Sequence, residues 1–216
     1  TLLEYDLLQM PGCGVGPAEH VADAQGAIAA PEFQPGVSRA AAGDLRGGTL
    51  IDVDVMLVYT PAVRNLLGGP VATQAYLDAA IVESNMVLED SLVDINLRPV
   101  LKHETNYVQS GEGLGTDLSR LRSSGDGFMA EVHSLRNGVG ADMVALIVRD
   151  SIGACGIAYL MAPPSAGFAS SAFSVTAQSC IAGLTLPHEL GHNQGSAHDR
   201  DNAGAAAYLD AGGNFI

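Results

Sequence analysis

Three histidines and one glutamate lie close together near the end of the sequence, and their side chains are of the types that bind metal ions and transfer protons. They are His188, Glu189, His192 and His198, in the run HELGHNQGSAH. Neutral imidazole nitrogens bind divalent transition metals, and three protein ligands leave one coordination position open for water or substrate. We therefore predict that the three histidines form a catalytic Zn²⁺ site and not a closed structural one.

The spacing of these residues predicts a helix followed by a sharp turn. On a helix, residues at i and i+4 project from one face, so His188 and His192 reach one ion together. Glu189 then has the position of a general base, which takes a proton from the activated water and does not bind the metal. A straight helix would carry His198 away from the ion, whereas Gly195 tolerates the positive φ that returns it.

The pattern H-E-x-x-H-x-x-G-x-x-H resembles that of the metzincin metallopeptidases at every fixed position. This resemblance implies a zinc-dependent endopeptidase. Two other functions stay open: a zinc-binding or adhesive module that has lost catalysis, and a zinc hydrolase of small amides. The intact Glu189 counts against the first, because a structural site has no use for that carboxylate. The remaining histidines lie outside any ligand spacing, and we expect no metal at His20, His103 or His133.

Composition and charge limit the partners of the protein. The chain has 216 residues, 47% of them apolar, which is enough for a globular domain with its own core. Its net charge is −14 and its ten basic residues are scattered, which argues against nucleic acid and anionic membranes. The uncharged stretch 151–187 is interrupted by two prolines and many polar residues, so it does not read as a membrane span. We expect a monomer that acts on protein or peptide substrates.

Hydrophobic patterns predict an α/β fold with a mixed, mostly parallel five-stranded sheet. Nearly continuous apolar runs are typical of strands buried on both faces, and apolar residues at helical spacing indicate amphipathic helices. The order of these elements resembles the N-terminal subdomain of metzincins, with the active-site helix near the end of the chain. The predicted strands are 51–60, 95–107, 141–149, 156–161 and 172–178, and the clearer predicted helices are 71–90, 128–136 and 181–193.

A more specific resemblance begins after residue 142. The runs CGIAYL and AFSV, then Cys180 and HELGHN, follow one another as in the bacterial reprolysin-like enzymes called peptidyl-Asp metalloendopeptidases. The resemblance implies a disulfide between Cys155 and Cys180, which would stabilise the fold by about 3 kcal/mol. It also implies that Gly156, Ile157 and Ala158 form an antiparallel edge strand that binds extended substrates by strand addition. An ordinary buried strand is the alternative for this segment.

The same resemblance implies cleavage on the amino side of aspartate. A cation must then receive the aspartate side chain, and the candidates are Arg149 and Arg200. Asp199 directly follows the third histidine, as in the reprolysin-like group. We expect this carboxylate to fix the turn and not to bind zinc, since it would fill the open position.

The first part of the chain resembles a pro-segment. Residues 1–48 are rich in glycine, alanine and proline, and we expect them to precede a catalytic domain at 49–216. Within them, MPGCGVG resembles the cysteine switch of metzincin zymogens, in which the thiolate of Cys13 would occupy the open zinc position. The arginine of that motif is replaced by Gly12, and a lone thiol without a role is the alternative.

Cysteine content and family resemblance predict a secreted protein. Three cysteines in an oxidising compartment would give one disulfide and one free thiol. No signal peptide is visible after Thr1, and no methionine follows Met161, although metzincins have a methionine turn beneath the zinc. We therefore expect the chain to be part of a longer protein, with the domain cut before that turn.

Overall fold

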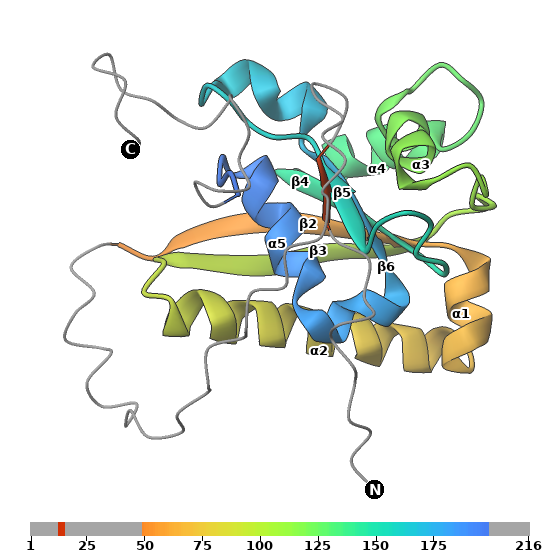
Figure 1. Cartoon of the computed structure of the whole chain (residues 1–216), viewed down its shortest axis with the longest axis horizontal. Coiled ribbons are helices and arrows are strands. Elements are labelled where there is room, and N and C mark those ends of the chain that lie inside the picture. The colour runs from red at the N-terminus through yellow and green to blue at the C-terminus, as the bar shows by residue number, and fades with distance from the viewer. Residues whose placement is uncertain (1–12, 16–48, 199–216) are drawn as a thin grey trace, which may run out of the picture.

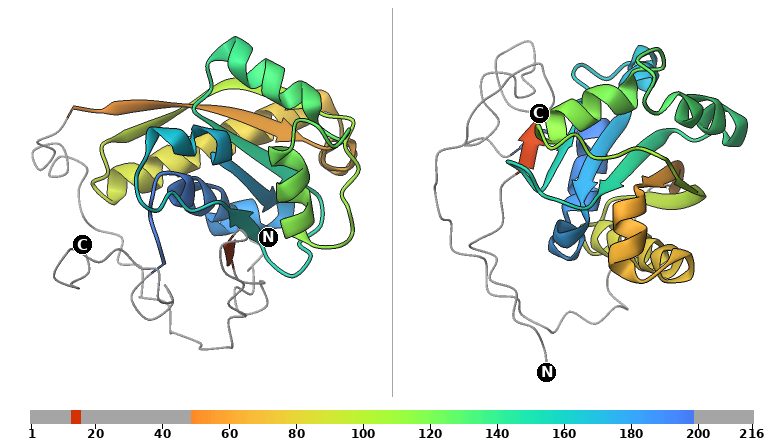
Figure 2. Two further views of the ribbon diagram at one scale, coloured as in Figure 1. Left: turned by 90° about the horizontal axis from the view of Figure 1, so that it is seen from above. Right: turned by 90° about the vertical axis from the view of Figure 1, so that its right-hand side faces the viewer.

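The computed structural model describes residues 13–15 and 49–198, which form one sheet with helices on both faces (Figures 1 and 2). The order of the strands in the sheet is β1-β5-β6-β4-β2-β3. Every pair is parallel except β5 and β6, so the sheet is mixed and mostly parallel, as predicted. The strands are β1 (Cys13–Val15), β2 (Ile51–Tyr59), β3 (Ile95–Glu104), β4 (Met143–Val148), β5 (Gly156–Ala158) and β6 (Phe173–Ala177).

The helices divide between the two faces of the sheet. Helices α2 and α5 pack on one face, and α3 and α4 on the other. The α-helices are α1 (Pro61–Leu67), α2 (Pro70–Asp90), α3 (Leu114–Arg122), α4 (Ala130–Val139) and α5 (Thr185–Asn193); two 3₁₀ helices, η2 (Ala166–Ser171) and η3 (Gln178–Gly183), flank β6. Within the described ranges, no helix combines the length and apolar character that a membrane span needs.

The core of the sheet is built on β4, in which every residue is buried. Side chains of a strand alternate between the two faces, so Val55 and Leu57 of β2 face α2 and α5, whereas Met56 faces α3 and α4. Leu186 and Leu190 of α5 are fully buried in the first of these clusters. Their burial anchors α5 to the sheet and thereby fixes the direction of the intervening side chains.

The helices differ from those predicted in several places, and the helix predicted at 128–136 spans Ala130–Val139. Helix α1 was not predicted; it begins at Pro61, directly after β2, because proline suits the first helical position and the Thr60 side chain accepts a hydrogen bond from the Val63 amide. The active-site helix begins at Thr185 and not at 181, because Leu184 has a φ of 63° and separates it from η3. Strand β1 was not predicted, and it adds a sixth strand outside the predicted five.

Asn193 fastens the end of α5 to two strands. Its buried side-chain amide donates to the carbonyl of Tyr159, just beyond β5, at 2.8 Å and to that of Phe173 in β6 at 3.2 Å. The amide of Met161 also donates to the carbonyl of His192 at 3.0 Å. The end of α5 is therefore held at the junction of β5 and β6.

We expect Asn193→Ala to destabilise the protein by about 1–3 kcal/mol, because it leaves buried carbonyls with fewer donors. Urea unfolding followed by circular dichroism measures this loss. The control is Asn137→Ala on α4, whose side chain is exposed and whose replacement should change stability little. Equal, small losses in the two variants would show that the bridge does not hold α5.

Candidate metal centre

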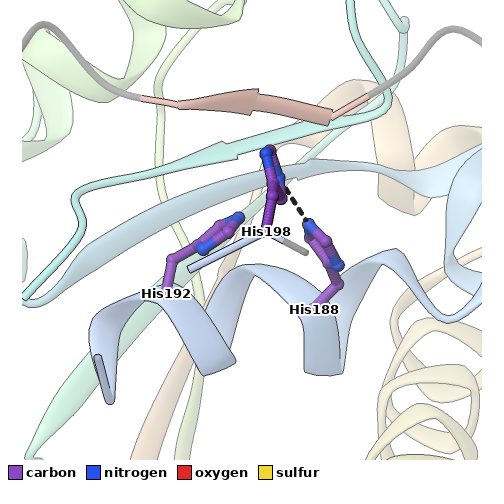
Figure 3. Close-up of side chains that lie close together, drawn as sticks. All are labelled: His188, His192 and His198. Atoms are coloured by element: carbon purple, nitrogen blue, oxygen red, sulfur yellow. Dashed lines mark hydrogen bonds between the residues drawn. The ribbon is translucent and has the colours of Figure 1, made fainter. Parts of the chain in front are cut away.

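The three histidines predicted as ligands come together at one point (Figure 3). One nitrogen of each ring lies within 4.8 Å of the others, and no other such group of three potential ligands occurs in the described part of the chain. His188 and His192 project from α5, and His198 approaches from the segment that follows the helix. The Nε2 atoms of His188 and His198 are 3.3 Å apart.

The turn after α5 returns the third histidine as predicted. Gly195 has a φ of 99°, a conformation that side chains with a Cβ rarely adopt. Its amide donates to the carbonyl of His192 at 3.0 Å, and the Ser196 amide donates to the carbonyl of Gly191 at 2.9 Å. The chain therefore reverses directly at the end of α5, which carries His198 back over the helix.

The surroundings of the rings favour neutral imidazole. His188 is exposed to solvent, but the protein displaces part of the water around its ring and lowers its pKa to about 4, and the neighbouring His192 and His198 reinforce this shift. Burial also lowers the pKa of His192, although a hydrogen bond to a backbone carbonyl opposes that shift. Neutral imidazole is the form that binds metals, so these rings need no deprotonation near pH 7.

The donor set fits Zn²⁺. Zinc binds histidine nitrogens at about 2.0–2.1 Å, which places two nitrogens of a tetrahedral site about 3.4 Å apart. The separation of 3.3 Å between His188 and His198 agrees with that value. His192 Nδ1 lies 2.7 Å from the carbonyl oxygen of Ser196, which only accepts hydrogen bonds, so Nδ1 carries the proton and Nε2 is free to bind the ion.

Glu189 lies on the buried side of α5, with its side chain inaccessible to solvent. It follows His188 directly in the helix and packs against β5 at Gly156. A carboxylate in this position is next to the metal ligands without being one of the three grouped side chains. This is the arrangement required of a general base.

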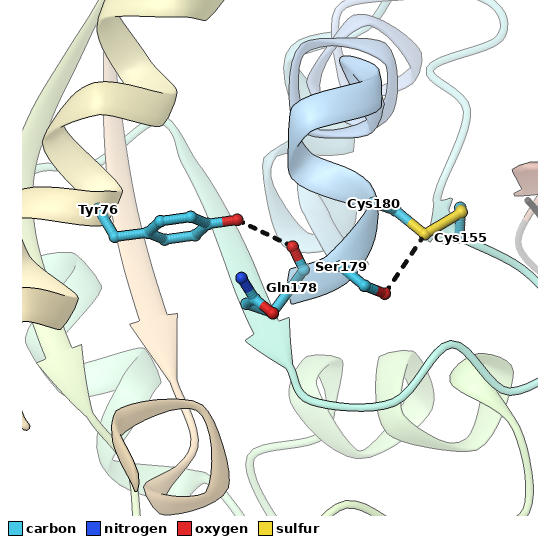
Figure 4. The surroundings of a disulfide bond; sticks show 5 residues. All are labelled: Tyr76, Cys155, Gln178, Ser179 and Cys180. Atoms are coloured by element: carbon cyan, nitrogen blue, oxygen red, sulfur yellow. Dashed lines mark hydrogen bonds between the residues drawn. A yellow bond between two sulfur atoms is a disulfide. The ribbon is translucent and has the colours of Figure 1, made fainter. Parts of the chain in front are cut away.

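A disulfide joins the start of β5 to the segment that leads into α5 (Figure 4). Cys155 precedes β5, and its sulfur is bonded to that of Cys180 in η3. The hydroxyl of Tyr76 on α2 donates to the carbonyl of Gln178 at 2.9 Å, which fastens the same segment from the other side. The segment that leads into α5 is thus held both to the start of β5 and to α2.

Strand β1 covers the strand that was predicted to be open to substrate. Its backbone runs parallel to β5, with Cys13 opposite Gly156, Gly14 opposite Ile157 and Val15 opposite Ala158. Strand β5 is antiparallel to β6 and would be the edge of the predicted five strands. In this structure the edge is occupied by a segment of the same chain.

None of the other described residues that the sequence analysis singled out as charged or histidine candidates belongs to the group of three histidines. Arg149 follows β4, is 56% exposed and pairs with Asp150 at 3.6 Å. Asp199, Arg200 and His20 lie outside the described residues.

His103 and His133 lie in β3 and α4, away from the triad. His103 approaches Glu131, and the ring of His133 forms a hydrogen bond with the carbonyl of Leu121.

Two contributors to the site were missed by sequence reasoning. Asn193 lies within the run HELGHNQGSAH, and the only signal for a role was its position directly after His192 in the last turn of the predicted helix. Gly156 was predicted as part of a substrate-binding strand, but its contact with Glu189 was not foreseen. Both residues act between segments that are distant in sequence.

Comparisons with known proteins agree with this geometry. The chain is 35% identical over 153 residues to a peptidyl-Asp metalloendopeptidase of Stenotrophomonas maltophilia (strain K279a), covering 70% of this chain and 35% of that protein. A protein of the same name from Xanthomonas campestris pv. campestris is 31% identical over 171 residues, covering 78% of this chain and 39% of that protein. The chain therefore spans between about a third and two fifths of these relatives' lengths.

A solved structure and a family model complete the comparison. The structure, titled "Structure of a chaperone-substrate complex", shares the fold with a TM-score of 0.56 and 22% identity, over 74% of this chain and 26% of that chain. The model of the reprolysin-like metallo-peptidases of family M12 matches residues 49–216. Because this model covers more than half of the chain and the three histidines come together beside the buried Glu189, the chain belongs to metallo-peptidase family M12.

Proposed function

We propose that this chain carries the catalytic centre of a zinc-dependent endopeptidase. The observation that carries the proposal is the convergence of three imidazole nitrogens within 4.8 Å, two of them on the helix that also carries the buried Glu189. Membership of family M12 and the names of the relatives support it. Protein or peptide chains would be the substrates.

In this proposal the residues of the chain have separate tasks. Zn²⁺, when held by His188, His192 and His198, activates water and polarises the scissile carbonyl. Glu189 takes a proton from the attacking water on a carboxylate oxygen and then delivers it to the leaving nitrogen of the cleaved bond. The two histidines on α5 and the glutamate keep a fixed relative geometry because one short helix carries all three.

A catalytically silent zinc-binding module and a zinc hydrolase of small amides are the competing functions. The buried Glu189 beside the ligands argues against the silent module, which would not need a general base. Incubation of the full-length protein with casein, with and without a chelator, separates the alternatives. Chelator-sensitive cleavage of casein supports the endopeptidase; zinc binding without casein cleavage contradicts it.

We expect one zinc ion per chain, lost in His192→Ala because two remaining ligands hold the ion weakly. In Glu189→Gln the zinc should remain, while peptidase activity falls by at least about 10²-fold because the proton acceptor is gone. Metal analysis after dialysis and an assay on an unstructured protein measure the two effects. A metal-free Glu189→Gln protein beside a zinc-loaded His192→Ala protein would reverse these roles.

We further propose that cleavage occurs on the amino side of aspartate, as the resemblance noted in the sequence implies; the names of the relatives support a preference for aspartate. A cation near the cleft must then pair with the substrate carboxylate, and Arg149 and Arg200 are the candidates. The net charge of −14 opposes long-range attraction of acidic substrates, so this recognition would have to be local.

Cleavage sites in an unstructured protein, mapped by mass spectrometry, should cluster before aspartate. If one of the two arginines receives that side chain, its replacement by alanine should lower kcat/KM for aspartate sites by about tenfold or more, since one charge-assisted contact is lost. The other arginine then serves as the control. Cuts scattered without regard to aspartate would exclude this specificity.

We also propose that the protein is secreted as a latent zymogen, with residues 1–48 as its pro-segment. The disulfide is consistent with an oxidising compartment. The register of β1 supports a role for Cys13 in latency, because its backbone lies opposite Gly156, which in turn contacts Glu189. A thiolate is a strong zinc ligand and would exclude the water that catalysis needs.

Cys13→Ser should raise the peptidase activity of the uncleaved chain, because a hydroxyl is a much weaker zinc ligand than a thiolate. The thiol of the unmodified chain should also react more slowly with a thiol reagent when zinc is bound. Val15→Ser, in the same strand, is the control for disturbance of β1. Unchanged latency and equal thiol reactivity with and without zinc would rule out the switch.

A further inference from the structure

Gly156 lies where β5 passes closest to the active-site helix. A Cβ atom built on this residue would stand 2.4 Å from Oε1 and 2.7 Å from Cγ of Glu189, and 2.7 Å from Cγ2 of Thr185. Contacts below 3.0 Å do not occur between real Cβ atoms and their neighbours. Any side chain at this position would therefore displace the glutamate, the threonine or the strand.

The backbone conformation of Gly156 does not itself require glycine. Its φ lies outside the left-handed region that other glycines of the chain adopt, among them Gly153 with a φ of 81° and Gly195 with 99°. The space beside Glu189 is consequently the reason for glycine here. By comparison, a Cβ added to Gly115 on α3 would meet only Cδ1 of Ile157, at 3.9 Å.

The strand has little freedom to move away from the helix. Gly156 pairs with Thr176 of β6 in the antiparallel ladder, and the preceding Cys155 is bonded to Cys180. Beyond the other end of β5, the carbonyl of Tyr159 accepts a hydrogen bond from Asn193 of α5. A clash at residue 156 would therefore be relieved mainly by the side chains of Glu189 and Thr185.

We propose that Gly156 is a positioning residue, whose missing side chain allows the Glu189 carboxylate to lie against β5 beside the metal ligands. The inference rests on the proposed peptidase function for its effect on catalysis, but not for its structural content. Gly156 does no chemistry itself. It sets the location of the group that accepts and returns the proton.

A stability cycle tests the contact without any assay of activity. Gly156→Ala should lower the urea midpoint of the otherwise unchanged chain. The second background is the double variant Glu189→Ala with Thr185→Ser, which lacks all three clashing atoms. In this background Gly156→Ala should be neutral or slightly stabilising, because Gly→Ala substitutions are so where space and backbone conformation permit. Gly115→Ala on α3 is the matched control, since its Cβ would meet only Cδ1 of Ile157, at 3.9 Å.

Kinetics and metal analysis test the positioning role. Because displacement of a catalytic group by about 1 Å costs roughly 10²-fold in rate, kcat of Gly156→Ala should fall by that order, while KM and the zinc content change little. Gly115→Ala should retain kcat within about twofold. An equal loss of stability from Gly156→Ala in both backgrounds, or full kcat in a folded Gly156→Ala protein, would overturn the proposal. If the unmodified full-length chain has no peptidase activity, the proposed function fails, whereas the stability cycle still reports on Gly156.

Discussion

The packing of α5 against the sheet is the interaction on which the metal centre depends. Leu186 and Leu190 are fully buried on the face that contacts the sheet, and the residues between them include His188 and Glu189. Because side chains on a helix keep fixed angular relations, burial of the leucines directs the histidine and the glutamate as well. Asn193 then holds the end of the helix to β5 and β6. The packing of α5 in the hydrophobic core thus sets the positions of the two histidines and the glutamate that it carries.

The third ligand depends on local backbone geometry instead of core packing. His198 is not on the helix, and only the reversal at Gly195 returns it to the other two histidines. The carbonyl of Ser196 in that reversal also accepts a hydrogen bond from Nδ1 of His192. One turn therefore places the third histidine of the proposed metal site and selects the tautomer of another, which leaves Nε2 of His192 free to bind a metal ion.

Strand β5 connects the metal centre with the outer edge of the sheet. Gly156 of this strand contacts Glu189 of α5, and its backbone also pairs with β1 opposite Cys13. The disulfide at Cys155 and the bonds of Asn193 restrain the two ends of the strand. A segment that pairs with this edge therefore lies beside the strand that contacts Glu189, whether it is β1 of the same chain or, in the function proposed above, an extended substrate.

The sequence by itself determined the donor set and the local structure that carries it. The spacing of His188 and His192 is a property of one helix, and the positive φ of Gly195 is a property of one residue, so both follow from short-range geometry. The buried strands were likewise visible as apolar runs. Only the tertiary structure decided the pairing of β1 with β5, the contact of Gly156 with Glu189 and the hydrogen bonds of Asn193. These join segments far apart in the chain, and their partners are chosen by the packing of the whole sheet, which hydrophobic periodicity in one segment does not specify.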